Sequence, residues 1–164
     1  MSTVISPADF RNAMACWAMT VHVVTTSGSA GYYGFTASAL CPVTDDPATL
    51  VLCLNHMRGR DVIFRENGVL RINTLAQEQK HIADIFAGRA GQPASDRFRQ
   101  GGVWEVDAAY GPALENAVTQ LACSIDDARR VGTHTILTCA VRTVHINGHL
   151  APLVHARRAY AALA

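Results

Sequence analysis

The sequence predicts a mainly β fold, a β-barrel with a few peripheral helices. Runs of β-branched and apolar residues recur along the chain between turn residues, whereas only two or three segments carry a helical pattern. Strands and helices do not alternate regularly, which argues against a parallel α/β sheet. With 164 residues, 49% of them apolar, the chain is long enough to build a sizeable core. We therefore expect residues 1–164 to form a single domain.

The first helix is predicted from its start signals. Ser6 is a favourable N-cap, Pro7 suits the first helical position and Asp9 places an acid in the first turn. Apolar residues then recur at helical spacing, which predicts one buried stripe formed by Phe10, Ala13, Met14, Trp17 and Ala18.

Strands are expected over residues 20–26 and 32–40, because both segments are rich in β-branched or aromatic residues. A Gly- and Ser-containing loop at residues 27–31 separates them and is able to turn a hairpin. Asp45, Asp46 and Pro47 form a turn signal. Residues 49–55 that follow are almost continuously apolar and predict a central strand.

The middle of the chain predicts two more helices around a strand. A short helix is expected at residues 61–66, closed by Asn67 and Gly68, followed by a strand at residues 69–75. Residues 77–87 form an amphipathic helix that Gly88 ends. Residues 89–102 are polar and lack periodicity, so they predict a long loop.

The last third of the sequence predicts strands. We expect them at residues 117–127, 132–146 and 150–155. Asp126 with Asp127 separates the first pair, and Asn147 with Gly148, the strongest short turn signal of the chain, separates the second.

Composition excludes several classes of protein. Charged residues make up 16% of the chain and the net charge is +1, whereas a nucleic-acid binder normally has a clear basic excess. No apolar run approaches the roughly 20 residues that span a bilayer. The N-terminus lacks a basic segment followed by an apolar one. We therefore expect a soluble, cytoplasmic protein that binds neither nucleic acid nor membrane.

Common catalytic and metal motifs are absent from the sequence. It contains no Gly-x-Gly-x-x-Gly or P-loop motif, no Gly-x-Ser-x-Gly elbow and no His-Glu-x-x-His. The five cysteines include no Cys-x-x-Cys pair, so buried free thiols are expected rather than disulfides or a zinc site. His145 and His149 flank a predicted turn with no carboxylate or thiol at ligand spacing, which favours solvated histidines. No metal is expected.

Residues 34–47 are the most informative stretch, because small residues stand where an ordinary strand would be bulky. Small side chains let a flat ligand lie against the backbone, whose N–H and C=O groups then pair with its polar edge; an isoalloxazine ring is such a ligand. Close packing of the strand against a helix explains the same residues. Composition alone leaves both interpretations open.

A series of short motifs occurs in order along the chain: DFRNAM (9–14), VVTT (23–26), GFTASA (34–39), VTDDP (43–47), LVLCLN (50–55), INTL (72–75), FAG (86–88) and GTH (132–134). This series resembles the flavin reductase family, and more narrowly the reductase components of two-component flavin-dependent monooxygenases. The 4-hydroxyphenylacetate 3-monooxygenase reductases and the pyrimidine-utilisation flavin reductases are the most similar.

The resemblance implies a fold and an activity. The fold would be an FMN-binding split β-barrel of Greek-key type that forms a homodimer. The activity would be hydride transfer from NADH or NADPH to FMN or FAD, with the reduced flavin diffusing to a partner monooxygenase. Hydride transfer of this kind needs alignment of the two rings rather than a protein acid or base.

The resemblance also implies the site residues. The isoalloxazine ring would lie on Thr36, Ala37, Ser38, Ala39 and Leu40. The ribityl-phosphate would lie against the segment that contains Cys53, Leu54, Asn55, Gly59 and Arg60, with the Arg60 guanidinium on the phosphate. Phe86 is either a neighbour of the flavin or a core residue of its helix, and both interpretations stay open.

His134, in Gly-Thr-His, matches a histidine that contacts the nicotinamide in the family, where it would orient the cofactor. Arg157 and Tyr160 match a C-terminal element that closes over the nicotinamide. The aromatic pair that precedes this element in relatives is replaced here by His155 and Ala156. This departure leaves open a non-catalytic flavin-binding module. A second alternative, on the same fold, is a reductase of another acceptor, such as a corrinoid or a ferric chelate.

Overall fold

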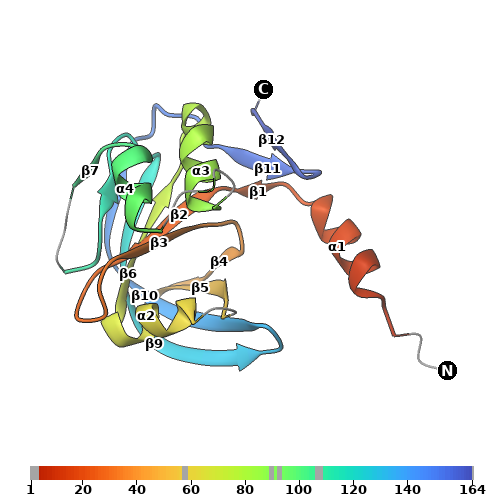
Figure 1. The fold of residues 1–164 in the computed structure, drawn as a ribbon, viewed down its shortest axis with the longest axis horizontal. Helices are drawn as coiled ribbons and strands as arrows, with labels where there is room; N and C mark the ends of the chain where they lie inside the picture. Colours follow the sequence, from red (N-terminus) through yellow and green to blue (C-terminus); the bar gives the residue numbers. More distant parts are fainter. Residues whose placement is uncertain (1–3, 57–58, 89–90, 92–93, 106–108, 164) are drawn as a thin grey trace.

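The protein is mainly β, as the sequence predicts. Its computed structural model describes residues 4–56, 59–88, 91, 94–105 and 109–163. A curved antiparallel sheet of seven strands, in the order β3-β2-β6-β9-β10-β5-β4, forms the body of the molecule (Figure 1). The strands of this sheet are β2 (His22–Thr26), β3 (Tyr33–Ala37), β4 (Leu40–Asp45), β5 (Ala48–Asn55), β6 (Val69–Thr74), β9 (Thr119–Val131) and β10 (His134–Ile146).

Two strands that follow each other in the chain lie at opposite edges of this sheet. β3 pairs with β2 at one edge, and β4 pairs with β5 at the other. The chain therefore leaves one edge and joins the other through Ser38 and Ala39. The prediction of one continuous strand over residues 32–40 was wrong for this reason, because no single strand can pair at both edges.

The β9–β10 hairpin is longer than expected. β9 does not stop at Asp126 and Asp127 but continues to Val131, and the hairpin turns at Gly132. The register shifts opposite Thr138, where Asp126 has no partner in the ladder. The two aspartates thus mark a β-bulge inside one strand, a feature that bends the strand without ending it.

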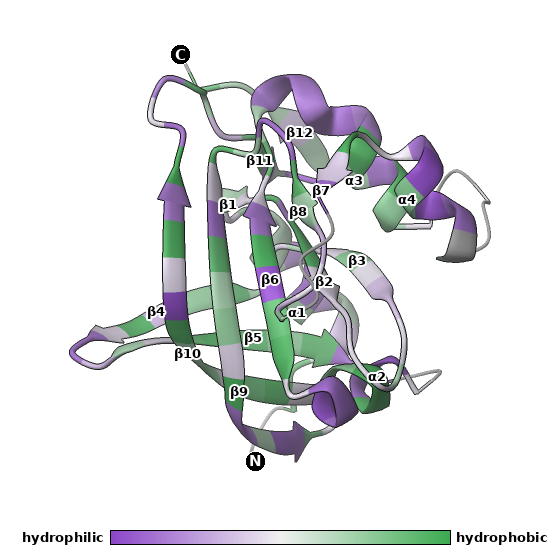
Figure 2. Ribbon diagram, turned by 90° about the vertical axis from the view of Figure 1, so that its left-hand side faces the viewer, coloured by the Kyte–Doolittle hydropathy of each residue, from purple (hydrophilic) through white to green (hydrophobic). Residues whose placement is uncertain are grey.

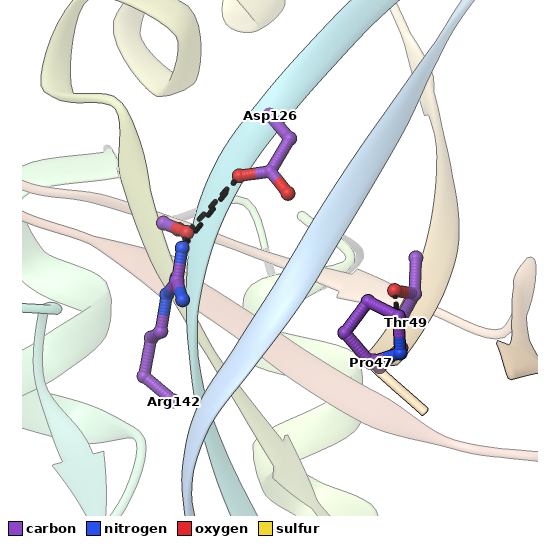
Figure 3. A network of polar contacts seen from close by, with 5 residues as sticks. Pro47, Thr49, Asp126 and Arg142 are labelled. Carbon is purple, nitrogen blue, oxygen red and sulfur yellow. Dashed lines mark hydrogen bonds and ion pairs between the residues drawn. The ribbon is translucent and has the colours of Figure 1, made fainter. Parts of the chain in front are cut away.

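Polar side chains cross this bulge (Figure 3). The Arg142 Nε donates to Ser124 Oγ at 3.0 Å, and that hydroxyl donates to Asp126 Oδ1 at 3.2 Å.

At the β4–β5 turn, the Thr49 hydroxyl donates to the Pro47 carbonyl at 2.7 Å. The Asp-Asp-Pro turn signal is therefore confirmed.

The remaining elements cover the sheet or extend it. The helices are α1 (Pro7–Ala15), α2 (Arg60–Asn67), α3 (Lys80–Phe86) and α4 (Arg97–Gln100). Two 3-10 turns are η1 (Gln77–Gln79) and η2 (Ala94–Asp96). A second sheet has the order β1-β11-β12 and a third pairs β7 with β8. Their strands are β1 (Met19–Thr20), β7 (Trp104–Glu105), β8 (Ala113–Leu114), β11 (Val154–Ala156) and β12 (Ala159–Ala161).

Two predictions about connections need correction. The segment 89–102 is not simply a loop, since its described part contains η2 and α4; residues 89–90 and 92–93 lie outside the described residues. The turn at Asn147 does form, with Leu150 N donating to its carbonyl. However, the strand that follows pairs with β1 and not with β10, because the chain moves to the second sheet.

The core consists of two clusters of buried apolar residues. One lies along the sheet and around Phe64 of α2, whose ring meets Phe35 edge-on at 5.5 Å. The other lies between the sheet and α3 and includes Ile82 and Phe86. Figure 2 shows the hydrophobic residues concentrated along the strands, whereas α3 and α4 present hydrophilic residues. None of the described helices is long and apolar enough to cross a membrane.

The first helix starts as predicted but does not bury its stripe. Ser6 Oγ accepts a hydrogen bond from Asp9 N at 3.1 Å, which confirms the N-cap. The helix projects away from the sheets (Figure 1). Phe10 is 57% exposed and Trp17 is 61% exposed. The prediction of a buried stripe was therefore wrong for a single copy of the chain, because the described elements do not cover these side chains.

The cysteines are free, and only some are buried. Burial raises the pKa of Cys123 and of Cys139 to about 12, so both thiols stay protonated. Cys53 is half-buried, whereas Cys16 and Cys41 are exposed. The prediction of buried thiols was therefore wrong for these last two, which lie at the C-terminal end of α1 and on the edge strand β4.

Candidate functional site

A cleft of about 170 Å³ opens at the end of edge strand β3. Its lining joins three elements that are far apart in the sequence: β3, the end of α3 and the β11–β12 hairpin. The lining residues are Val21, Thr36, Ala37, Ser38, Ala87, His155 and Tyr160. Four of them, Thr36, Ala37, Ser38 and Tyr160, were predicted as cofactor-binding residues from the sequence.

The floor of this cleft is strand β3, which is fixed but only half paired. The Thr36 hydroxyl donates to the Ala83 carbonyl of α3 at 2.7 Å. The ladder uses only one side of β3, since β2 is its single neighbour in the sheet. Near its start, the Gly34 carbonyl already accepts a hydrogen bond from Arg97 Nη1 at 3.4 Å. Toward its Ser38 end, the backbone is able to face the polar edge of a flat ligand, and the small side chains of Ala37 and Ser38 let such a ligand approach.

The wall of the cleft is Tyr160, which is held from three directions. Its hydroxyl donates to Asp84 Oδ1 at 3.0 Å. The Lys80 ammonium lies 5.5 Å from the centre of its ring, and the His155 ring meets it edge-on with centres 5.6 Å apart. Sequence reasoning missed His155 as a site residue, because it treated that position only as a departure from the family pattern.

A second group of predicted residues meets where β5 ends and α2 begins. Asn55 lies opposite His134 in the β5–β10 ladder. The next residue, His56, donates its N–H to the Thr133 carbonyl at 3.2 Å. Gly59 has a φ of 68°, a left-handed conformation that glycine adopts without strain, and it caps the helix that Arg60 starts. The chain thus brings Asn55, Gly59, Arg60 and His134 to one end of the sheet.

One backbone hydrogen bond joins the cleft to this second group. Cys53 N donates to the Ala39 carbonyl at 2.9 Å, and Leu40 lies opposite Leu52 in the β4–β5 ladder. Leu54 is 1% exposed, so its side chain belongs to the core and only its backbone borders the site. The predicted residues from Thr36 to Leu40 therefore lie beside the strand that carries Cys53, Leu54 and Asn55 and leads to Gly59 and Arg60.

His134 is exposed at the start of β10. Its Nδ1 lies 2.9 Å from the Thr133 hydroxyl, which fixes the orientation of the ring. An exposed, oriented imidazole is able to contact a ligand without a cost in core packing.

Two predicted residues lie apart from the rest. Phe86 is 1% exposed and packs against Phe98 and Trp104 with ring centres 5.1 and 5.2 Å away. Core packing, the second interpretation offered for it, therefore accounts for Phe86. Arg157 is exposed in the β11–β12 turn with a φ of 50°, and its N–H donates to the Ala15 carbonyl.

The residues present suit a flavin nucleotide. The cleft has an edge strand of the main sheet, β3, as its floor. The imidazole Nδ1 of His56 is buried and has no hydrogen-bond partner among the described residues. An imidazole nitrogen in this position is able to pair with a phosphate or ribityl oxygen. Sequence reasoning missed His56, although it stands between two residues that were predicted.

Two larger cavities lie elsewhere, at α3, β7 and β8. They measure about 320 and 590 Å³ and share Val103, Glu115 and Asn116. Neither contains a predicted site residue. Among the described residues, no group of three or more His, Cys, Asp or Glu side chains is placed to hold a metal ion.

Comparison with known proteins identifies the family. Residues 14–164 match the model of the flavin reductase like domain. The chain belongs to this flavin reductase family. It is 40% identical to the FMN reductase (NADH) RutF of Escherichia coli O139:H28 (strain E24377A / ETEC) over 162 residues, which cover 98% of this chain and 96% of the relative.

Solved structures of flavin reductases share the fold. A crystal structure of a putative flavin reductase from Haemophilus somnus 129PT superposes with a TM-score of 0.90 at 38% identity, covering 97% of this chain and all of the relative (100%). The flavin reductase PheA2 in its native state superposes with a TM-score of 0.86 at 25% identity, covering 98% of this chain and 99% of the relative.

Proposed function

We propose that this flavin reductase family member is an NADH:FMN oxidoreductase. The observation that carries the proposal is that the β3 cleft is joined through Ala39 and Cys53 to the strand end that precedes α2, where the exposed His134 lies opposite Asn55. The 40% identity to an FMN reductase (NADH) along nearly the whole chain supports FMN and NADH over FAD and NADPH.

The isoalloxazine ring would lie in the β3 cleft. Thr36, Ala37 and Ser38 would support it, with Ala39 and Leu40 continuing the surface toward Cys53. Backbone N–H groups of this unpaired strand edge would face the polar rim of the ring and stabilise the negative charge that reduction adds there.

The ribityl-phosphate would extend from the cleft toward α2. The N-terminus of a helix carries partial positive charge, which favours a phosphate. Arg60 would add a guanidinium, Gly59 would let the backbone approach closely, and His56 and Asn55 would hydrogen-bond oxygens of the chain. These residues would bind the flavin and would not transfer protons in the reaction.

His134 would orient the nicotinamide over the cleft, with His155 and Tyr160 closing the other side and Arg157 at its rim. When bound, the flavin supplies the acceptor for a hydride from the nicotinamide. The protein would contribute alignment of the two rings and exclusion of water.

We further propose the assembly that the family resemblance implies. The fold of residues 1–164 would be a single split β-barrel domain of Greek-key type, and two copies would form a homodimer. The unburied apolar face of α1, with Phe10 and Trp17, supports this proposal, because such a face is expected to be covered. Reduced flavin would diffuse to a partner monooxygenase.

The decisive experiment is an assay of the purified chain. We expect NADH oxidation that depends on added FMN. The loss of NADH absorbance, measured under air, reports this oxidation. FAD and NADPH, tested in parallel, should support lower kcat/KM values. Tight flavin binding without turnover would contradict the proposal and favour a flavin-binding module, and faster turnover with a corrinoid or ferric chelate would favour another acceptor.

A further inference from the structure

The carboxylate of Asp61 is buried in the first turn of α2. The residue is 1% exposed, and carboxylates are rarely buried this deeply unless they are paired. It follows Arg60 directly, and so it belongs to the turn where the phosphate is proposed to bind. The proposed function assigns no role to it.

The contacts of Asp61 reach two other elements. Its Oδ2 accepts a hydrogen bond from the Thr135 hydroxyl at 3.1 Å. The same oxygen lies 3.6 Å from Arg130 Nη2 and 3.9 Å from Arg65 Nη1. Its Oδ1 is buried without a hydrogen-bond partner among the described residues. One carboxylate oxygen thus accepts one hydrogen bond and lies within 4 Å of two guanidinium groups.

The partners of Asp61 sit beside His134. Thr135 is the next residue in β10 and is fully buried, at 0% exposed. Arg130 lies directly opposite Thr135 in β9. The carboxylate therefore ties the first turn of α2 to both strands of the hairpin that carries His134.

Asp61 is not needed to hold α2 onto the sheet. Phe64, which is 0% exposed, already anchors this helix in the core against Phe35 and Tyr33. Asn67, at the other end of the helix, also accepts a hydrogen bond from Ala30 N and donates to the Thr26 hydroxyl and the Gly31 carbonyl. The Asp61–Thr135 hydrogen bond adds a contact to β10 in the first turn, the end of the helix where the phosphate is proposed to bind.

We propose that Asp61 is a positioning residue that fixes the phosphate-binding turn relative to His134. This inference rests on the proposed function, because it assumes that flavin phosphate and nicotinamide bind at these two places. Binding of both substrates then depends on one buried carboxylate that touches neither.

The test uses isosteric variants of both partners. Asp61→Asn removes the charge but keeps the shape, and Thr135→Val removes the hydroxyl. Each should raise the KM for FMN and the KM for NADH about ten- to hundredfold, the size expected for a lost hydrogen bond to a charged group, with kcat within about twofold. Thr135→Ser keeps the hydroxyl and should restore both KM values.

A matched control is available in the same hairpin. Asp126 also pairs with an arginine and a hydroxyl, Arg142 and Ser124 (Figure 3), but its side chain is half exposed and it lies at the bulge, beside the C-terminal end of α2 and not its first turn. Asp126→Asn should leave both KM values unchanged.

The outcomes separate the inference from the proposed function. If the wild-type chain does not oxidise NADH with FMN, the proposed function fails before any variant is made. If the wild type is active and Asp61→Asn lowers only the melting temperature, with both KM values within about twofold, Asp61 is merely structural and the inference is wrong. If Asp61→Asn does not fold, the comparison of Thr135→Val with Thr135→Ser decides in the same way.

Discussion

At the scale of single residues, the buried imidazole of His22 couples the stability of the fold to pH. His22 is 8% exposed, and its Nδ1 lies 3.0 Å from the Thr74 hydroxyl. Burial lowers its pKa from 6.5 to about 4. As the pH falls below 6.5, His22 therefore becomes protonated in the unfolded chain, whereas in the folded chain it stays neutral until the pH approaches 4.

This difference predicts that acid destabilises the fold through His22. Between pH 7 and pH 5 the free energy of unfolding should fall by about 2 kcal/mol from this group. Urea denaturation at pH 7 and at pH 5 measures this change in the free energy of unfolding. His22→Gln should lose that part of the pH dependence, whereas His149→Gln, at an exposed position, should keep it. Equal pH dependence in the wild type and in His22→Gln would contradict the assignment.

His134 provides the second prediction at this scale. His134→Ala should lower kcat/KM for NADH about tenfold or more, because an orienting contact is lost. The Kd for FMN, followed by quenching of flavin fluorescence, should change little. His145→Ala, at the far end of the same strand, is the control. Unchanged turnover in His134→Ala would remove its proposed role.

At the scale of elements, the position of β3 depends on Gly34. A Cβ at this residue would lie 2.8 Å from Phe86 Cε1 and 3.0 Å from Phe98 Cζ. Neither ring has room to retreat, because both pack against Trp104. Close packing, one of the two interpretations of the small residues of this strand, thus applies at Gly34, and the flat ligand is a proposal for Thr36, Ala37 and Ser38.

Gly34→Ala is therefore expected to push β3 away from α3. The free energy of unfolding should fall by about 1–3 kcal/mol, and the Kd for FMN should rise because the floor of the cleft moves. Thermal denaturation and flavin titration check the two effects. Gly148→Ala, where an added Cβ meets nothing within 4 Å, should leave both unchanged; a stable Gly34→Ala variant with normal FMN binding would refute this account.

At the scale of the whole molecule, the face of α1 is the feature that a single copy leaves unexplained. Analytical ultracentrifugation of the wild type should report a dimer. Replacing Phe10 and Trp17 together by Ser should shift the mass toward the monomer, since it removes the apolar area that association would bury. Val103→Ser, at a residue that is 66% exposed near β7, serves as the control.

A monomeric wild type would contradict the proposed homodimer. A double variant that stays dimeric would place the interface elsewhere and leave α1 without a partner.

The sequence by itself determined the local features of this protein. The N-cap at Ser6, the turn before Ala48 and the apolar strand β5 form as predicted, because each depends on residues next to one another. The ordered motifs also indicated the family, and Thr36, Ala37 and Ser38 do line a cleft. These signals are contained within short segments of the chain.

Only the tertiary structure decided which segments meet. It placed β3 and β4 at opposite edges, turned Asp126 into a bulge, brought His155 and Tyr160 over β3, and set Asp61 against Thr135. The physical reason is that each contact depends on strand pairing between residues far apart in the chain, and side-chain periodicity reports which face of a strand is buried but not which strand lies beside it.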